Sequence, residues 1–189
     1  MGKGHDQMLA FFLSLIDSPE SRTKFEQLYT AFRTVMFHTA NRILHNSHDA
    51  EDIVADSFLA VINILDTIDM TDEVKVQNLM ITISKNRALN FLQKKKRAVF
   101  TEEEREMPQT FSQPCSAIDN LELAEVLAGL IRQLPPEQQD VLRLQYYYDY
   151  SYQQIARLIG KQEPAVRQIS SRAKKRLRQL LEEGEGQHG

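Results

Sequence analysis

The chain has 189 residues, of which 42% are hydrophobic and 26% charged, and its formal net charge is −3. Its single cysteine, Cys115, excludes a framework of intrachain disulfides, and no run of eighteen uncharged apolar residues suggests a transmembrane helix. The first twenty residues lack the long apolar region and small-residue cleavage site of a secretory signal. We therefore expect a cytoplasmic protein of one or two domains.

Three amphipathic helices are predicted in the first half of the chain. Apolar residues recur at helical spacing from Phe25 to Ile43, from Ala50 to Leu65 and from Val76 to Leu92. The polar segment DTIDMTDEVK, between the second and third of these helices, is predicted to be a loop. Residues 1–24 form an N-terminal extension whose role the pattern leaves open.

The helical pattern stops after Arg97 and returns at Leu121. Residues 98–120 contain two prolines, many acidic residues and little apolar content, which predicts a flexible acidic linker. After the helix predicted from Leu121, Pro136 suits the first turn of another helix. The predicted fold class is therefore all-α, with two small helical domains over 25–97 and 121–183 and a tail over 184–189.

The segment SYQQIARLIG, residues 151–160, has the features of the first helix of a helix-turn-helix. Ser151 and Gln154 form the S-x-x-Q pattern of a capping box, so a helix is expected to begin at Tyr152. Gly160 accepts the left-handed backbone that ends a helix in a sharp turn. A second helix is expected to open at Pro164, with Glu163 at its cap, after a turn of helix-turn-helix length.

The second helix of this motif is basic. From Arg157 to Arg178 there are eight Lys or Arg residues and one acidic residue, Glu163. In a helix-turn-helix the early residues of the second helix meet base edges in the major groove, where Arg can read guanine and Gln can read adenine, and later cations suit phosphates. The predicted DNA-facing residues are Gln162, Glu163, Arg167, Gln168, Ser171, Arg172, Lys174 and Lys175. A helical hairpin with a solvated charged face is the alternative interpretation.

Residues 85–97 form a second basic segment, with six cations and no acidic residue. It is separated from the first by the acidic linker. Two basic segments on either side of an acidic one indicate two surfaces for a polyanion.

Acidic residues gather where the helix containing Ala50 begins, at Asp49, Glu51, Asp52 and Asp56. Acids in a first turn interact favourably with the helix dipole, so part of this pattern is ordinary capping. A metal site built from His45, His48 and a carboxylate is an alternative, but the sequence offers no second cluster of ligands.

The run HDAEDIVADSFLAV resembles the D-A-E-D signature of bacterial RNA polymerase sigma factors of the sigma-70 family. The chain is most similar to the compact extracytoplasmic-function (ECF) group, which keeps only the second and fourth conserved regions. ITISKNRALNFLQKKKR looks like that group's promoter-melting helix, and the helix-turn-helix looks like its fourth region. The resemblance covers residues 25–97 and 121–182.

The resemblance implies a function for each region. Region 2, over 25–97, would grip the clamp coiled coil of core RNA polymerase through Asp49, Glu51, Asp52 and Asp56, and would open the downstream (−10) promoter element. The residues implied for that element are Asn78, Lys85, Asn86, Arg87, Asn90, Lys94, Lys95, Lys96 and Arg97. Region 4, over 121–183, would read the upstream (−35) element through the DNA-facing residues of the helix-turn-helix.

The implied partners are core RNA polymerase, contacted through its clamp coiled coil and flap, promoter DNA, and an anti-sigma factor. No cofactor, metal, membrane insertion or catalysis by the chain itself is expected. The chain departs from the family pattern where tryptophans are common, with Ile62 and Leu79, and carries four acidic residues between Asp66 and Glu73.

Two other functions are compatible with parts of the pattern. A helix-turn-helix transcriptional regulator with a helical sensor or dimerisation domain would bind paired half-sites on its own. A metal-dependent hydrolase using His45 and His48 is disfavoured, because the sequence has no Gly-rich phosphate loop, H-E-x-x-H motif or cysteine cluster.

Overall fold

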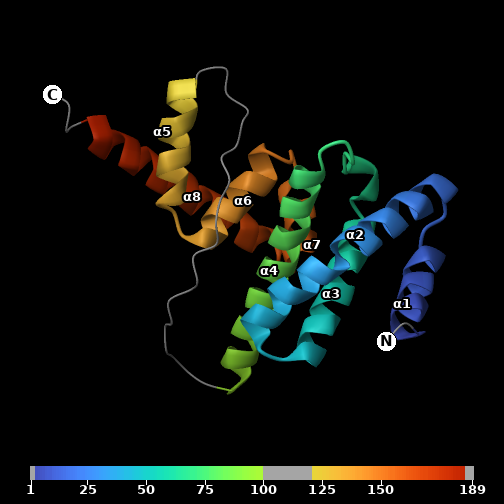
Figure 1. The fold of residues 1–189 in the computed structure, drawn as a ribbon. Helices are drawn as coiled ribbons and strands as arrows, with labels where there is room; N and C mark the ends of the chain where they lie inside the picture. The colour runs from blue at the N-terminus through green and yellow to red at the C-terminus, as the bar shows by residue number, and fades with distance from the viewer. Residues whose placement is uncertain (1–2, 100–120, 186–189) are drawn as a thin grey trace. The chain divides into compact units, whose positions relative to one another are not determined.

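The computed structural model describes residues 3–99 and 121–185, and in these residues it contains eight α-helices, one short 3₁₀ helix and no strand. The helices are α1 (Lys3–Ser14), α2 (Pro19–Leu44), α3 (Ser47–Ile62), α4 (Glu73–Val99), α5 (Leu121–Arg132), α6 (Pro136–Tyr146), α7 (Tyr152–Ile159) and α8 (Glu163–Glu185), with the 3₁₀ helix at Leu65–Thr67 (Figure 1). The predicted all-α fold is confirmed. The helix α4 extends two residues into the predicted linker, 98–120, and α8 extends two residues into the predicted tail, 184–189. The other residues of the linker and the tail lie outside the described residues.

The helices form two compact units, one built on α1–α4 and the other on α5–α8. This division agrees with the predicted pair of small helical domains. No helix in the described part of the chain has the length and apolar character needed to cross a bilayer.

In the N-terminal unit, α2 packs along both α3 and α4, and α3 also packs on α4. The buried residues of α2 include Phe25, Leu28, Phe32 and Met36, which recur every three or four positions and so lie on one face. Where the three helices meet, the buried residues Ala40, Ala50 and Ala88 are all small. Small side chains at a crossing let the helix backbones approach closely.

The N-terminal extension contributes to this core. Phe12 of α1 is 1% exposed, and its ring centroid lies 5.5 Å from that of Phe25, 6.0 Å from that of Tyr29 and 6.1 Å from that of Phe58. Aromatic pairs at such distances add to the stabilisation that burial alone provides. Because α1 contacts both α2 and α3, part of the extension is a structural element of the N-terminal unit.

The helix α2 begins earlier than the apolar pattern indicates. The Ser18 hydroxyl accepts a hydrogen bond from the amide of Ser21, and Pro19 occupies the first turn. The boundary predicted at residue 25 therefore falls inside α2, because the first turns of this helix are polar and carry no apolar signal.

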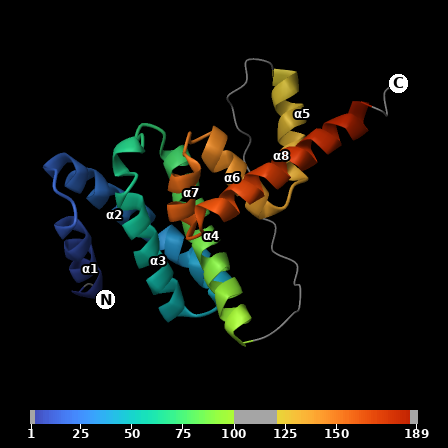
Figure 2. The ribbon, with the colours of Figure 1, turned by 180° about the vertical axis from the view of Figure 1, so that it is seen from behind.

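In the C-terminal unit, α8 packs on α6 and α5 (Figure 2). Leu134, Leu142, Ala173 and Leu180 form a buried cluster, with Leu130 and Leu177 packed against it. The positions of the candidate DNA-facing residues on α8 depend on this small core.

Candidate nucleic-acid and partner interfaces

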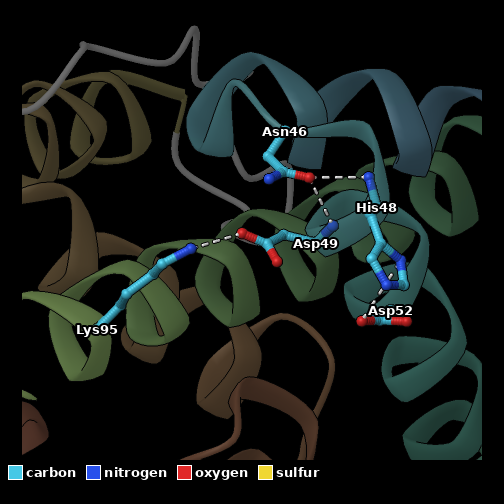
Figure 3. Close-up of polar contacts among 5 residues, drawn as sticks. All are labelled: Asn46, His48, Asp49, Asp52 and Lys95. Atoms are coloured by element: carbon cyan, nitrogen blue, oxygen red, sulfur yellow. Dashed lines mark hydrogen bonds and ion pairs between the residues drawn. The ribbon is translucent and has the colours of Figure 1, made fainter.

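A capped turn between α2 and α3 places the acidic residues of α3. His45 ends α2 in the left-handed conformation, with φ of 51°. The Asn46 side-chain oxygen then accepts hydrogen bonds from the backbone amides of His48 (2.9 Å) and Asp49 (3.1 Å), as Figure 3 shows. Two of the amides that a helix start leaves unpaired are thereby satisfied, and the first turn of α3 is held in place.

Two of the four predicted polymerase-binding acids, Asp49 and Glu51, form close ion pairs with cations on neighbouring helices and are the less exposed of the four. Asp49 Oδ2 lies 3.0 Å from Lys95 Nζ of α4 (Figure 3), and Glu51 Oε2 accepts a hydrogen bond of 2.6 Å from Arg33 Nη2 of α2. The Arg33 side chain is only 14% exposed. A charge this far from water needs its partner, so Glu51 has a structural role in the unit.

The other two acids, Asp52 and Asp56, are exposed one helical turn apart on α3. Their side chains are 69% and 64% exposed. Asp52 Oδ2 lies 3.9 Å from His48 Nδ1, and Asp56 Oδ2 lies 3.7 Å from Arg87 Nη1. The pair of His48 and Asp52 is exposed on both sides and contributes little free energy, so Asp52 can exchange it for a basic partner surface. Asp56 differs, because the Arg87 side chain that it faces is only 14% exposed.

The acidic residues between α3 and α4 form hydrogen bonds within the N-terminal unit. Asp69 accepts hydrogen bonds from the backbone amide (2.9 Å) and the hydroxyl (2.8 Å) of Thr71, and these bonds lower the pKa of Asp69. Asp72 accepts from the amide of Lys75 at 2.8 Å, as a capping residue does at the start of a helix. Asp66 accepts from the Ser21 hydroxyl at 3.3 Å. The unusual acidity of this loop therefore has a local structural explanation.

The residues predicted to act at the downstream element differ in exposure along α4. Lys85 and Asn86 are buried, and the Asn86 amide donates to the carbonyl of Thr82 on the preceding turn (2.9 Å). Asn78, Arg87 and Asn90 are partly buried. All five residues lie on α4, but only Asn78, Arg87 and Asn90 have side chains that are partly accessible to solvent.

The basic run near the end of α4 is exposed at Lys94, Lys95 and Lys96, whereas the side chain of Arg97 lies outside the described residues. Lysines in the last turns of a helix interact favourably with its dipole, so these charges also stabilise α4. Among the three, Lys95 is held by Asp49. Lys94 and Lys96 are the more available cations for a phosphate.

The predicted first helix of the helix-turn-helix is confirmed. The Ser151 amide donates to Gln154 Oε1 (2.9 Å) and the Gln154 amide donates to Ser151 Oγ (3.3 Å), which is the reciprocal pair of a capping box. The helix α7 begins at Tyr152, and Gly160 follows it with φ of 72°. The cap of the next helix is one residue earlier than predicted, because the Gln162 carbonyl, not Glu163, accepts from the amides of Ala165 and Val166.

The helix α8 has a buried face and an exposed face. Val166, Ser170, Ala173 and Leu180 are buried at spacings of three, four and seven residues. The predicted DNA-facing residues that are exposed are Gln162, Arg167, Gln168, Ser171, Arg172 and Lys175. Glu163 and Lys174 are partly buried, and Arg167 forms an ion pair with Glu163 one turn away. A row of polar and basic side chains on one face of a helix is what base and phosphate contacts in a groove require.

Lys174 is held by two tyrosines. Its Nζ lies 3.5 Å from Tyr152 Oη and 5.3 Å from the ring centroid of Tyr146. Interactions with Tyr146 and then Tyr152 raise the pKa of Lys174. Hydrogen bonds with Ser170 and Gln145 lower the pKa of Tyr152.

The sequence did not indicate Tyr152 as a residue of the candidate site. Its partners Gln145 and Ser170 are 7 and 18 positions away and lie on other helices. The available signal was a polar aromatic residue directly after the capping serine, at the start of the helix that precedes the basic one.

The alternative metal site is not formed by the residues that the structure describes. Among them, no group of three or more His, Cys, Asp or Glu side chains is arranged to hold a metal ion. His45 instead ends α2, and His48 lies beside Asp52 on the surface of α3.

Comparison with protein families identifies both units. Residues 28–98 match the sigma-70 region 2 family, and residues 124–177 match the family described as sigma-70, region 4. The two matches follow each other in the order that the resemblance predicted and together take up most of the chain. The first begins after α1, which lies outside it.

Curated relatives are similar to this chain over nearly their whole length. The ECF RNA polymerase sigma factor SigM of Bacillus subtilis is 22% identical over 160 residues, covering 84% of this chain and 96% of the relative. The RNA polymerase sigma factor YlaC of the same organism is 24% identical, covering 85% of this chain and 93% of the relative.

Solved structures of sigma factors are similar in sequence at about the same level. The sigma factor RpoE of Bartonella quintana, solved with the anti-sigma factor NepR, is 21% identical with a TM-score of 0.35, covering 84% of this chain and 96% of that chain. CnrH, solved with the cytosolic domain of CnrY, is 21% identical with a TM-score of 0.35, covering 93% of this chain and 95% of that chain. From the family matches and the curated relatives, this chain belongs to the sigma-70 family of RNA polymerase sigma factors, in its ECF group.

Proposed function

We propose that this chain binds core RNA polymerase and directs it to promoters at which α8 reads the upstream (−35) element and α4 helps to open the downstream (−10) element. Phosphodiester synthesis belongs to the polymerase, and the chain itself catalyses no reaction. An anti-sigma factor is a further proposed partner.

The observation that carries this proposal is the exposed row on α8, held by a capped helix-turn-helix. Arg167, Gln168 and Arg172 lie early in α8 and are exposed, opposite the buried residues Val166 and Ala173. Arg and Gln have the donor pairs that fit guanine and adenine in the major groove. The turn at Gly160, where φ is 72°, supports this arrangement of the two helices.

The proposed polymerase contact is centred on Asp52 and Asp56, which are the exposed acids of α3. Asp49 and Glu51 contribute to the same negative end of the helix while bonded to Lys95 and Arg33. Negative charge on one partner and positive charge on the other speed association and fix orientation, which suits the grip on a basic coiled coil.

At the downstream element we place the contacts on the accessible part of α4. The exposed cations Lys94, Lys95 and Lys96 would hold phosphates, with Arg97 extending the run, and the partly buried Asn78, Arg87 and Asn90 would lie beside the opened strand. Lys85 and Asn86 are buried, so we expect them to stabilise the packing of α4 and not to contact DNA directly.

Run-off transcription with purified core polymerase on a library of genomic fragments tests the proposal. The expected result is a set of transcripts that requires both proteins and whose start sites share two upstream sequence elements. The absence of any chain-dependent transcript, together with tight binding of the chain alone to paired half-sites, would favour the helix-turn-helix regulator instead.

A further inference from the structure

A closed set of hydrogen bonds joins the last three helices around Tyr152. Gln145 Nε2 of α6 donates to Tyr152 Oη of α7 at 3.1 Å, and Ser170 Oγ of α8 donates to Gln145 Oε1 at 2.8 Å. Tyr152 Oη and Ser170 Oγ lie 3.3 Å apart and share the third bond. The side chains of these three residues therefore fix one another across α6, α7 and α8.

The burial of these side chains makes it costly to break the hydrogen bonds between them. Ser170 is fully buried, and Gln145 is partly buried. A buried hydroxyl or amide without a hydrogen-bond partner destabilises the fold, because its free energy of desolvation is no longer offset. The three groups consequently favour one arrangement of the helices over alternatives in which any of the bonds is broken.

The ring of Tyr152 lies against a predicted base-reading residue. Arg167 Cζ is 5.0 Å from the centroid of the Tyr152 ring, within the range of a cation–π contact. The Arg167 Nε and Nη2 groups also donate to Glu163 Oε1. The exposed guanidinium thus contacts both an aromatic ring and a carboxylate one helical turn away.

We propose that Tyr152 is a positioning residue for promoter recognition, because its ring holds the Arg167 guanidinium. Its hydroxyl contributes to the stability of the C-terminal unit through Gln145 and Ser170. This inference rests on the proposed function, in which α8 reads the upstream element. An arginine that is already held in its contact geometry loses less conformational freedom when it binds a base, so more of the contact energy is available for discrimination.

The inference predicts different effects from two substitutions at one position. Tyr152→Leu removes the ring, and we expect selectivity for the matched upstream element over a scrambled one to fall about 2- to 5-fold, the factor that an exposed cation–π contact corresponds to. Tyr152→Phe keeps the ring and should restore most of that selectivity. In an Arg167→Ala background, Tyr152→Leu should cause no further loss, because its effect acts through Arg167.

The experiment measures competition between two promoters for the full chain bound to core polymerase. The promoters share the downstream element and differ only in the upstream one, and thermal unfolding of each variant is measured in parallel. An equal loss with Tyr152→Leu in both backgrounds, or no loss in either, overturns the inference while wild-type selectivity still supports the proposed function. A wild-type chain that does not distinguish the promoters overturns both.

A second measurement needs no substitution. Arg172 is exposed on the same helix and has no ion pair or ring contact among the described residues, so it serves as an internal control. We expect NMR relaxation of the Arg167 Nε–H group to show higher order than that of Arg172 in the free chain. Equal order at the two sites would contradict the pre-positioning of Arg167.

Discussion

Four neighbouring acids on α3 have different roles at the scale of single residues. Asp49 and Glu51 are bonded to cations of α4 and α2, whereas Asp52 and Asp56 are exposed. The sequence grouped all four as partner-binding residues, because their cations are 46 and 18 positions away and only the folded chain brings them together. A variant that tests partner binding must therefore avoid the structural acids.

Asp52→Arg should weaken binding to core polymerase without changing the stability of the chain. Its carboxylate is 69% exposed and reaches only His48, at 3.9 Å, so its removal disturbs no buried group. Titration of labelled core polymerase with the variant, alongside thermal unfolding, gives both quantities. Wild-type affinity for polymerase would mean that this end of α3 is not the contact.

Glu51→Gln is the matched variant, because it neutralises an adjacent acid that has an internal partner. Loss of the charge leaves the largely buried Arg33 guanidinium without its carboxylate, and we expect the free energy of unfolding to fall by roughly 1–3 kcal/mol. Chemical denaturation measures this difference. A fall of the same size for Asp52→Arg would remove the distinction between the two acids.

At the scale of elements, short-range signals predicted the helix-turn-helix well and long-range contacts were missed. The capping box at Ser151 and Gln154 and the turn at Gly160 depend on residues within ten positions, so their chemistry can be read directly. The packing of α1 on α2 and α3 depends on Phe12 reaching Phe58, 46 positions away. An apolar stretch near a chain end does not by itself reveal which face it will cover.

Gly160→Ala should destabilise the helix-turn-helix, whereas Gly129→Ala should not. Gly160 has φ of 72°, a conformation that costs a residue with a Cβ about 1–2 kcal/mol. Gly129 lies within α5, where an added Cβ would meet only Arg132 Nη2 at 3.8 Å, so alanine should stabilise that helix slightly. Denaturant midpoints of the two variants check this, and equal midpoints would be inconsistent with the strained turn.

Phe12→Ala tests the contribution of α1. The ring is 1% exposed and lies against the rings of Phe25, Tyr29 and Phe58 on α2 and α3, so its removal should lower the free energy of unfolding by about 3–5 kcal/mol. Phe11→Ala is the control, because the neighbouring ring is 55% exposed. If both variants unfold like the wild type, α1 does not stabilise the N-terminal unit.

At the scale of the whole molecule, a small net charge coexists with separate surfaces of opposite sign. The chain carries 23 Lys and Arg residues against 26 Asp and Glu residues, yet exposed cations gather at the end of α4 and along α8. The exposed acidic residues Asp52 and Asp56 lie on α3. A formal charge of −3 therefore gives no measure of affinity for DNA, since binding depends on the charges that face the phosphates.

Salt dependence can separate the three exposed lysines of α4. If Lys94 and Lys96 each neutralise one phosphate, replacing either with Gln should reduce the slope of log affinity against log salt by about 0.9. Lys95→Gln should reduce it by less, because Asp49 already shares that charge. The slopes are measured for the chain bound to core polymerase on promoter DNA, and three equal reductions would show that the pair with Asp49 has no effect on DNA binding.

The burial of Phe12 has a practical consequence for anyone who shortens this protein. A fragment that starts at residue 28, where the match to region 2 begins, would lack α1 and the first turns of α2. The rings of Tyr29 and Phe58 would then lose the covering contacts of Phe12 and Phe25. Such a fragment should form inclusion bodies, and refolding screens would need to restore the missing helix rather than adjust the buffer.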